Sequence, residues 1–117
     1  MTGHPGETTE DYKELKAFVK EQKFERLGVF PYSHEEGTYC DANYTDDVPT
    51  ATKKRRAAAI MEVQRKLSLT RNEASLGKEL KVIIDKKEGN YWVGRSEFDS
   101  PEVDPEILIK SRKRLNV

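Results

Sequence analysis

The stretch from residue 72 to residue 95 reads NEASLGKELKVIIDKKEGNYWVGR, and its hydrophobic period changes partway along. Before Gly77 apolar residues recur at helical spacing, whereas residues 80–84 alternate as they do in a strand. Gly77 suits the C-terminal cap of a helix. The pair Gly89-Asn90 is a hairpin turn signal, so residues 91–98 are the expected return strand. A helix followed by an antiparallel hairpin is therefore predicted here.

The segments before this stretch add a second helix and a short strand. Residues 49–76 carry an apolar stripe over about 26 residues, which predicts a helix of roughly 40 Å that connects two bodies. A capping box of Thr8 and Asp11 predicts a helix over residues 10–22. Residues 26–32 are short, apolar and bounded by turn residues, as in a buried strand.

Two acidic loops separate these elements. Residues 33–48 contain no Lys or Arg and show no period, so they predict a long loop. A second acidic loop over residues 97–106 leads to a third strand at residues 107–109. Gly94 inside the return strand indicates a bulge or a close backbone approach. Three strands with one apolar face do not close a barrel, so the C-terminal body is expected to be an incomplete one.

The composition limits the function classes. The chain has 117 residues, with 21 basic and 21 acidic side chains, so binding to nucleic acid by bulk charge alone is disfavoured. No apolar run approaches the ~20 residues of a membrane span, so no membrane partner is expected. One cysteine and two histidines form neither an internal disulfide nor a four-ligand zinc or iron–sulfur site, which favours a cytoplasmic protein.

Three features near the N-terminal half were weighed as sites. The loop with Gly3, Pro5, Gly6 and Glu7 precedes a helix and places backbone N–H groups near its start, but a plain tight turn is favoured because the phosphate-loop lysine is missing. His34 beside acidic neighbours fits a general base or metal ligand, although a solvated loop is favoured. Cys40 has no neighbour in sequence that would activate it.

Basic residues mark two other segments. The run at residues 53–56 contacts phosphate, balances the preceding acidic loop or simply solvates a helix. Basic and aromatic side chains interleave in the hairpin, as in small barrels that bind RNA, and a protein partner is equally consistent. The expected docking residues are Lys81, Tyr91, Trp92 and Arg95, and a core position is equally consistent for Trp92. No set of residues forms a self-sufficient active site.

An ordered series of motifs resembles the radical-SAM methylthiotransferases over nearly the whole chain. The motifs are GHPGETTEDY at 3–12, FERLGVFPYS at 24–33, HEEGT at 34–38, QRKLSL at 64–69, NEASLG at 72–77, YWVGR at 91–95 and SPEVD at 100–104. The last two resemble the family's terminal TRAM domain. Residues 32–38 lack the Arg of the pattern Tyr-Ser-x-Arg-x-Gly-Thr that is usual in the tRNA-modifying branch. The sequence therefore resembles the branch that methylthiolates an aspartate of small-subunit ribosomal protein number twelve.

The resemblance implies that the chain is a C-terminal fragment of an α+β enzyme. Residues 1–48 would end the radical-SAM barrel with a helix and a strand, residues 49–77 would be the connector helix, and residues 78–117 a partial antiparallel TRAM-like barrel. The longer protein would use S-adenosylmethionine (SAM) and two 4Fe–4S clusters, neither bound by this fragment, which is expected to be inactive alone. A tRNA-modifying enzyme and a non-catalytic RNA- or protein-binding module are the alternatives, and the oligomeric state stays open.

The resemblance also assigns roles to residues. Gly3, Pro5, Gly6 and Glu7 would lie on the side of the SAM pocket, at the mouth of the barrel. The substrate rim would consist of Tyr32, Ser33, Glu35 and Glu36. The TRAM-like strands would hold the macromolecular substrate, a ribosomal protein, with a contact to RNA through the same strands. No catalytic or metal-binding residue is expected in this chain.

Overall fold

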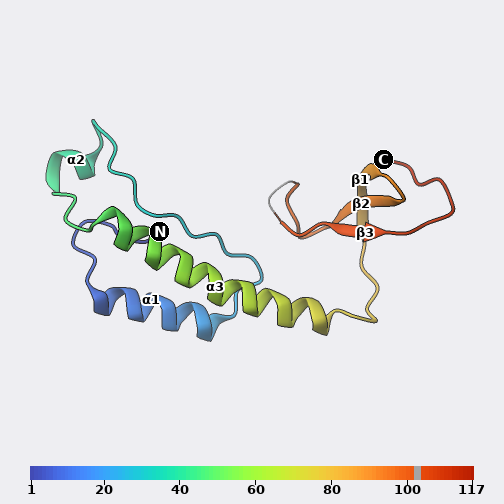
Figure 1. Ribbon diagram of the computed structural model, residues 1–117, viewed down its shortest axis with the longest axis horizontal. Helices are drawn as coiled ribbons and strands as arrows, with labels where there is room; N and C mark the ends of the chain where they lie inside the picture. The colour runs from blue at the N-terminus through green and yellow to red at the C-terminus, as the bar shows by residue number, and fades with distance from the viewer. Residues whose placement is uncertain (102–103) are drawn as a thin grey trace. The chain divides into compact units, whose positions relative to one another are not determined.

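The computed structural model of the chain describes residues 1–101 and 104–117 and divides into two units, Met1–Leu76 and Gly77–Val117 (Figure 1). The first unit holds the helices α1 (Thr9–Gln22), α2 (Tyr39–Asn43) and α3 (Thr50–Ala74). The second holds the strands β1 (Val82–Glu88), β2 (Tyr91–Ser96) and β3 (Ile107–Ile109). The α+β class is therefore confirmed. None of the helices in the described ranges is long and apolar enough to cross a membrane.

Helix α1 begins at the capping box expected from the sequence. The Thr8 hydroxyl accepts a hydrogen bond from the Asp11 backbone N–H at 3.1 Å, and the Asp11 carboxylate accepts one from the Thr8 N–H at 2.7 Å. These two bonds satisfy N–H groups that the first turn leaves without partners. The bonds that the Thr8 N–H and hydroxyl donate to the Asp11 carboxylate lower the pKa of Asp11. The helix ends at Lys23, whose backbone is left-handed with φ 49°.

Helix α3 follows Pro49 and runs for 25 residues, about 37 Å at 1.5 Å per residue. It ends at Ser75, two residues before Gly77, whose φ of +82° is the left-handed conformation expected after a helix. By its contacts α3 belongs to the first unit, where it packs along α1. The division into 1–48, 49–77 and 78–117 stays a prediction.

The core of the first unit lies where α1, α3 and the N-terminal segment meet. Ile60 on α3 and Val19 on α1 are almost completely buried, and Ala57 lies one turn before Ile60 on the same face. On the same helix Gln64 is buried, whereas Met61 keeps 40% of its surface exposed. The buried stripe is narrow, so α3 leaves much of its circumference to solvent.

The segment from residue 26 to residue 32 is not the regular strand that its apolar composition suggested. It is extended, but its pairing is a single parallel bridge between Thr2 and Pro31. Pro31 has no N–H to donate, and in the described residues only the short stretch around Thr2 lies beside it. The acidic segment 33–48, which is predicted to be a loop, contains the short helix α2. The helix forms because the Thr38 hydroxyl caps its first turn by accepting a hydrogen bond from the Asp41 N–H.

The second unit is an open antiparallel sheet in the order β1-β2-β3. Its first two strands are joined at the Gly89-Asn90 turn, and the register slips between Ile84 and Lys86, so Asp85 is the extra residue of a bulge. Gly94 lies opposite this bulge, and a Cβ there would approach the Ile83 carbonyl oxygen within 2.4 Å. Both consequences expected of this glycine are therefore found. Part of the SPEVD motif, residues 102–103, lies outside the described residues.

Candidate functional site

The bridge between Thr2 and Pro31 brings the N-terminal loop beside the predicted substrate rim. The Thr2 N–H donates to the Phe30 carbonyl at 2.9 Å, and the Tyr32 N–H donates to the Thr2 carbonyl at 2.7 Å. Thr2 is completely buried, and its hydroxyl donates to the Lys53 carbonyl at 2.9 Å. The loop of residues 3–7, the start of the rim at Tyr32 and the start of α3 therefore form one locally packed region.

Two glycines of the loop are required by its backbone. Gly3 and Gly6 have φ values of +79° and +82°, which side chains with a Cβ rarely adopt. At Gly3 a Cβ would also come within 2.2 Å of the Lys53 side chain. At Gly6 the space is open, and its N–H donates to the Asp47 carboxylate at 2.8 Å. The Gly-rich motif is thus a tightly packed turn, with Gly3 against α3 and Gly6 facing outward.

Lys53, the first residue of the basic run, is buried at the base of this region. Its Nζ bonds both carboxylate oxygens of Asp46, at 2.5 and 2.6 Å, and lies 4.9 Å from the centre of the Tyr32 ring. The carboxylate and the ring together replace the water that a buried ammonium loses. For Lys53, this ion pair confirms the prediction that the basic run at residues 53–56 balances the charge of the acidic loop.

The last residue of the basic run, Arg56, pairs with a residue assigned to the SAM side. Its guanidinium donates to the Glu7 carboxylate at 2.5 Å and to the Glu7 carbonyl at 3.3 Å. Only 9% of the Arg56 side chain and 11% of the Glu7 side chain are exposed. The pair fixes the loop to α3, and it also occupies the Glu7 carboxylate. Lys54 and Arg55, between these two cations, are exposed.

A polar chain starts at Tyr32 and ends at α2. The Tyr32 hydroxyl lies 2.8 Å from His34 Nδ1, and His34 Nε2 lies 3.4 Å from the Asp41 carboxylate. Burial, reinforced by Cys40, Asp46 and Asp41, raises the pKa of Tyr32 to about 12. The raised pKa keeps the hydroxyl protonated, and the His34 ring connects it to the Asp41 carboxylate. His34 is held as a hydrogen-bonded link rather than free in a solvated loop.

His4 and Cys40 form a second pair, which no pattern in the sequence predicts. His4 Nε2 lies 3.6 Å from Cys40 Sγ, and Nδ1 lies 3.0 Å from the Pro5 carbonyl oxygen. Because a carbonyl only accepts, Nδ1 carries the proton and Nε2 offers its lone pair to the thiol. The two residues are 36 positions apart, so inspection of sequence neighbours found no partner for Cys40.

The remaining rim residues lie at the surface. Ser33, Glu35 and Glu36 are all exposed, and the Ser33 hydroxyl donates to the Glu35 carboxylate. The Glu35 carbonyl accepts from the Thr38 hydroxyl at 2.7 Å, which fixes the entry to α2. The rim therefore presents acidic side chains to solvent from an ordered turn, which suits contact with a basic protein segment.

The docking residues of the hairpin differ in their availability. Lys81 and Tyr91 are exposed, whereas only 8% of the Trp92 surface is exposed. Lys87, on the neighbouring strand, places its Nζ 5.4 Å from the centre of the Trp92 ring. Arg95 is half-buried and donates to both oxygens of Asp85, the bulged residue, at 3.2 Å. Lys81 and Tyr91 are free to contact a partner, while Trp92 and Arg95 also maintain the sheet.

The second unit is similar to a known family of domains. Residues 76–117 match the family model of the TRAM domain, so the C-terminal sheet is part of such a domain.

Relatives over nearly the whole chain are ribosomal protein uS12 methylthiotransferases named RimO. The protein from Porphyromonas gingivalis is 57% identical over 109 residues, which are 93% of this chain and 25% of that protein. Those from Bacteroides thetaiotaomicron and Christiangramia forsetii are 52% identical over 118 residues and 54% identical over 109 residues, covering 100% and 93% of this chain. The chain spans about a quarter of the length of these relatives: 25%, 27% and 24%. It is thus homologous to one part of RimO, and the resemblance to the methylthiotransferases is confirmed.

The cofactors implied by the family do not fit the residues of this chain taken alone. A 4Fe–4S cluster is held by several thiolates, and this chain has one cysteine. Among the described residues no three His, Cys, Asp or Glu side chains gather so as to hold a metal ion. The polar groups of the Gly-rich loop already have partners within the chain. The Gly6 N–H donates to the Asp47 carboxylate, and the Glu7 carboxylate accepts from Arg56.

Proposed function

We propose that this chain is one part of a larger methylthiotransferase that modifies an aspartate of ribosomal protein uS12. The single observation that supports the proposal most strongly is the 57% identity over 109 residues to a RimO protein. At such identity over a continuous segment the local structure and its contacts are inherited together. The chemistry itself belongs to the rest of the longer protein, which would hold the SAM and the 4Fe–4S clusters, and the chain alone is inactive.

In this proposal the first unit supplies the rim of the reaction site. Residues 1–48 are the C-terminal part of the radical-SAM barrel, with the loop of residues 3–7 on the cofactor side. The proposed substrate rim is Tyr32, Ser33, Glu35 and Glu36, of which Tyr32 is buried and the other three are exposed to the substrate side. The Glu7–Arg56 and Lys53–Asp46 pairs support this role because they fix the loop and the acidic segment to α3. A rigid rim binds a flexible loop of the substrate protein at a smaller entropic cost than a mobile rim would.

The second unit is proposed to dock the macromolecular substrate. Residues 49–77 connect it to the rim, and residues 78–117 form the partial TRAM domain. The exposed side chains Lys81 and Tyr91 give it one cationic and one aromatic contact. The enzyme would act in the cytoplasm, where ribosomal proteins are made.

RNA binding through the TRAM domain is the second candidate function. The observation that favours it is Lys87 lying over the Trp92 ring next to exposed Tyr91, in a hairpin that also exposes Lys81 at its other end. Basic and aromatic side chains together bind single-stranded nucleic acid. In this case the longer protein would be a tRNA-modifying methylthiotransferase, or the chain a binding module without catalysis.

The two candidates differ in what the chain binds. We expect the 117-residue chain to bind purified uS12 in a calorimetric titration, and the double variant Lys81→Ala/Tyr91→Ala to weaken this binding. A control variant, Lys113→Ala, changes an exposed lysine outside the docking set and should leave the affinity unchanged. Salt-sensitive binding of tRNA without binding of uS12 would contradict the proposal and favour the second candidate.

A further inference from the structure

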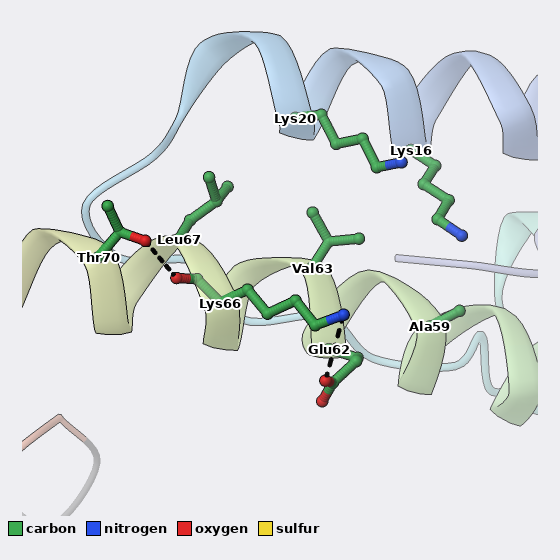
Figure 2. Close-up of a pocket in the computed structure, with 8 residues that line it drawn as sticks. All are labelled: Lys16, Lys20, Ala59, Glu62, Val63, Lys66, Leu67 and Thr70. Atoms are coloured by element: carbon green, nitrogen blue, oxygen red, sulfur yellow. Dashed lines mark hydrogen bonds and ion pairs between the residues drawn. The ribbon is translucent and has the colours of Figure 1, made fainter.

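A groove with an apolar floor runs between α1 and α3, away from the Gly-rich loop and the rim. It has a volume of about 520 Å³, and Figure 2 shows its lining. The floor consists of Ala59, Val63 and Leu67, which follow one another at intervals of four residues along α3. Val63 and Leu67 extend from α3 into the space between the two helices (Figure 2).

A second hollow extends the groove toward the end of α3. It has a volume of about 330 Å³ and shares Leu67 and Thr70 with the first, while Ala74 adds a further apolar position. From Ala59 to Ala74 the helix rises by about 22 Å at 1.5 Å per residue. The combined groove is therefore long enough for about four turns of a partner helix lying along it.

Lysines border the apolar floor on both sides. Lys16 and Lys20 extend from α1, one turn apart, and Lys66 extends from α3 (Figure 2). Lys66 lies 3.9 Å from Glu62, whose carboxylate is also held by Arg65 at 2.8 Å. Within the ranges that the structure describes, neither Lys16 nor Lys20 has an ion-pair partner. The groove thus carries a local positive charge although the whole chain has a formal net charge of zero.

We propose that this groove binds an acidic amphipathic helix of a partner protein. The apolar positions at intervals of four residues match the ridges of a helix that crosses α3 at a shallow angle. The lysines on both rims complement carboxylates placed on either side of the partner's apolar face. The groove lies within residues 1–48 and 49–77 of the methylthiotransferase proposal, but none of its residues belongs to the rim, the loop or the TRAM sheet, so its binding is tested separately.

Charge and apolarity together select this occupant over a nucleic acid. A phosphate backbone would satisfy Lys16 and Lys20, but it offers no apolar stripe to cover Val63 and Leu67. A neutral apolar helix would cover the floor and leave the lysine heads solvated as before. An acidic amphipathic helix satisfies both features at once, with the lysine stems packed along it.

The test is a titration of the 117-residue chain with a fluorescent synthetic helix of about four turns, with Leu at every fourth position and Glu on both flanks. Binding should be saturable and should weaken as salt rises. The variant Lys16→Glu/Lys20→Glu should reduce the affinity by about tenfold or more. The matched control, Lys13→Glu/Lys54→Glu, makes the same change in charge at exposed lysines outside the groove and should change it by less than about twofold.

Four results would overturn the proposal. The first is the absence of saturable binding while circular dichroism shows folded variants. The second is equal binding of a peptide with Lys in place of every Glu. The third is displacement of the peptide by single-stranded RNA with the same dependence on Lys16 and Lys20, which would make the groove a phosphate site. The fourth is self-association of the chain, detected by sedimentation and abolished by the groove variant, which would make a second copy the occupant. None of these results bears on uS12 binding.

Discussion

Replacement of Arg56 by alanine tests whether the Gly-rich loop is held to α3 by a buried ion pair. The Arg56–Glu7 contact of 2.5 Å joins side chains that are only 9% and 11% exposed. Removal of one partner leaves a carboxylate that has lost most of its water and its counter-charge, which costs about 3–5 kcal/mol. The packing of the guanidinium over the Tyr12 ring, at 5.4 Å, is lost as well and adds about 0.5–1 kcal/mol. We therefore expect Arg56→Ala to lower the free energy of unfolding by at least about 3 kcal/mol.

The assay is urea denaturation followed by circular dichroism, with Arg65→Ala as the matched control. Arg65 also pairs with a glutamate, Glu62, at 2.8 Å, but the two side chains are 66% and 49% exposed. Such a pair contributes less than about 1 kcal/mol. The double variant Arg56→Ala/Glu7→Gln should recover part of the loss because no unpaired carboxylate remains. If Arg56→Ala and Arg65→Ala destabilise the chain equally, the loop is not held as described.

Three further predictions follow from single positions. Gly3→Ala should lower the unfolding free energy by about 1–3 kcal/mol more than Gly6→Ala in the same urea titration. Both glycines need a positive φ, but only Gly3 faces the Lys53 side chain. Equal losses of unfolding free energy would refute the close contact. Gly94→Ala should break the pairing of β1 with β2, seen as faster amide exchange of the second unit alone, since the new Cβ meets the Ile83 carbonyl oxygen; unchanged exchange would contradict the bulge. Tyr32 should ionise near pH 12, above the ordinary tyrosine value near 10, in an ultraviolet titration with Tyr32→Phe as control. The raised pKa means that stability is retained below the ordinary value near 10 and falls as pH rises from there toward 12, because the unfolded chain releases this proton first; early ionisation of Tyr32 would refute its burial.

The elements governed by local rules were predictable from the sequence. The Thr8 and Asp11 box gave the start of α1, and the Gly89-Asn90 pair gave the hairpin turn. Gly94 predicted the bulge because its missing side chain leaves room for the backbone of the strand directly opposite. In each case the interacting groups lie within a few residues of one another or are fixed by the register of a hairpin.

The contacts of the candidate site were not predictable in the same way. The pairs Glu7–Arg56 and His4–Cys40 join residues 49 and 36 positions apart, so only the packing of the loop against α3 and α2 brings them together. The apolar composition of segment 26–32 predicts a strand, but it does not reveal whether a partner strand lies beside it. The capping hydroxyl of Thr38 was a local signal for α2 that was overlooked in the acidic loop.

The most direct test of the proposed function is a chimera of the Porphyromonas gingivalis RimO in which this chain replaces the 109 aligned residues. The chimera would be produced in cells that lack their own RimO, and uS12 would be analysed by mass spectrometry. We predict that uS12 gains one methylthio group on an aspartate. A folded chimera with a normal content of iron–sulfur clusters that leaves uS12 unmodified, or that methylthiolates tRNA instead, would contradict the assignment.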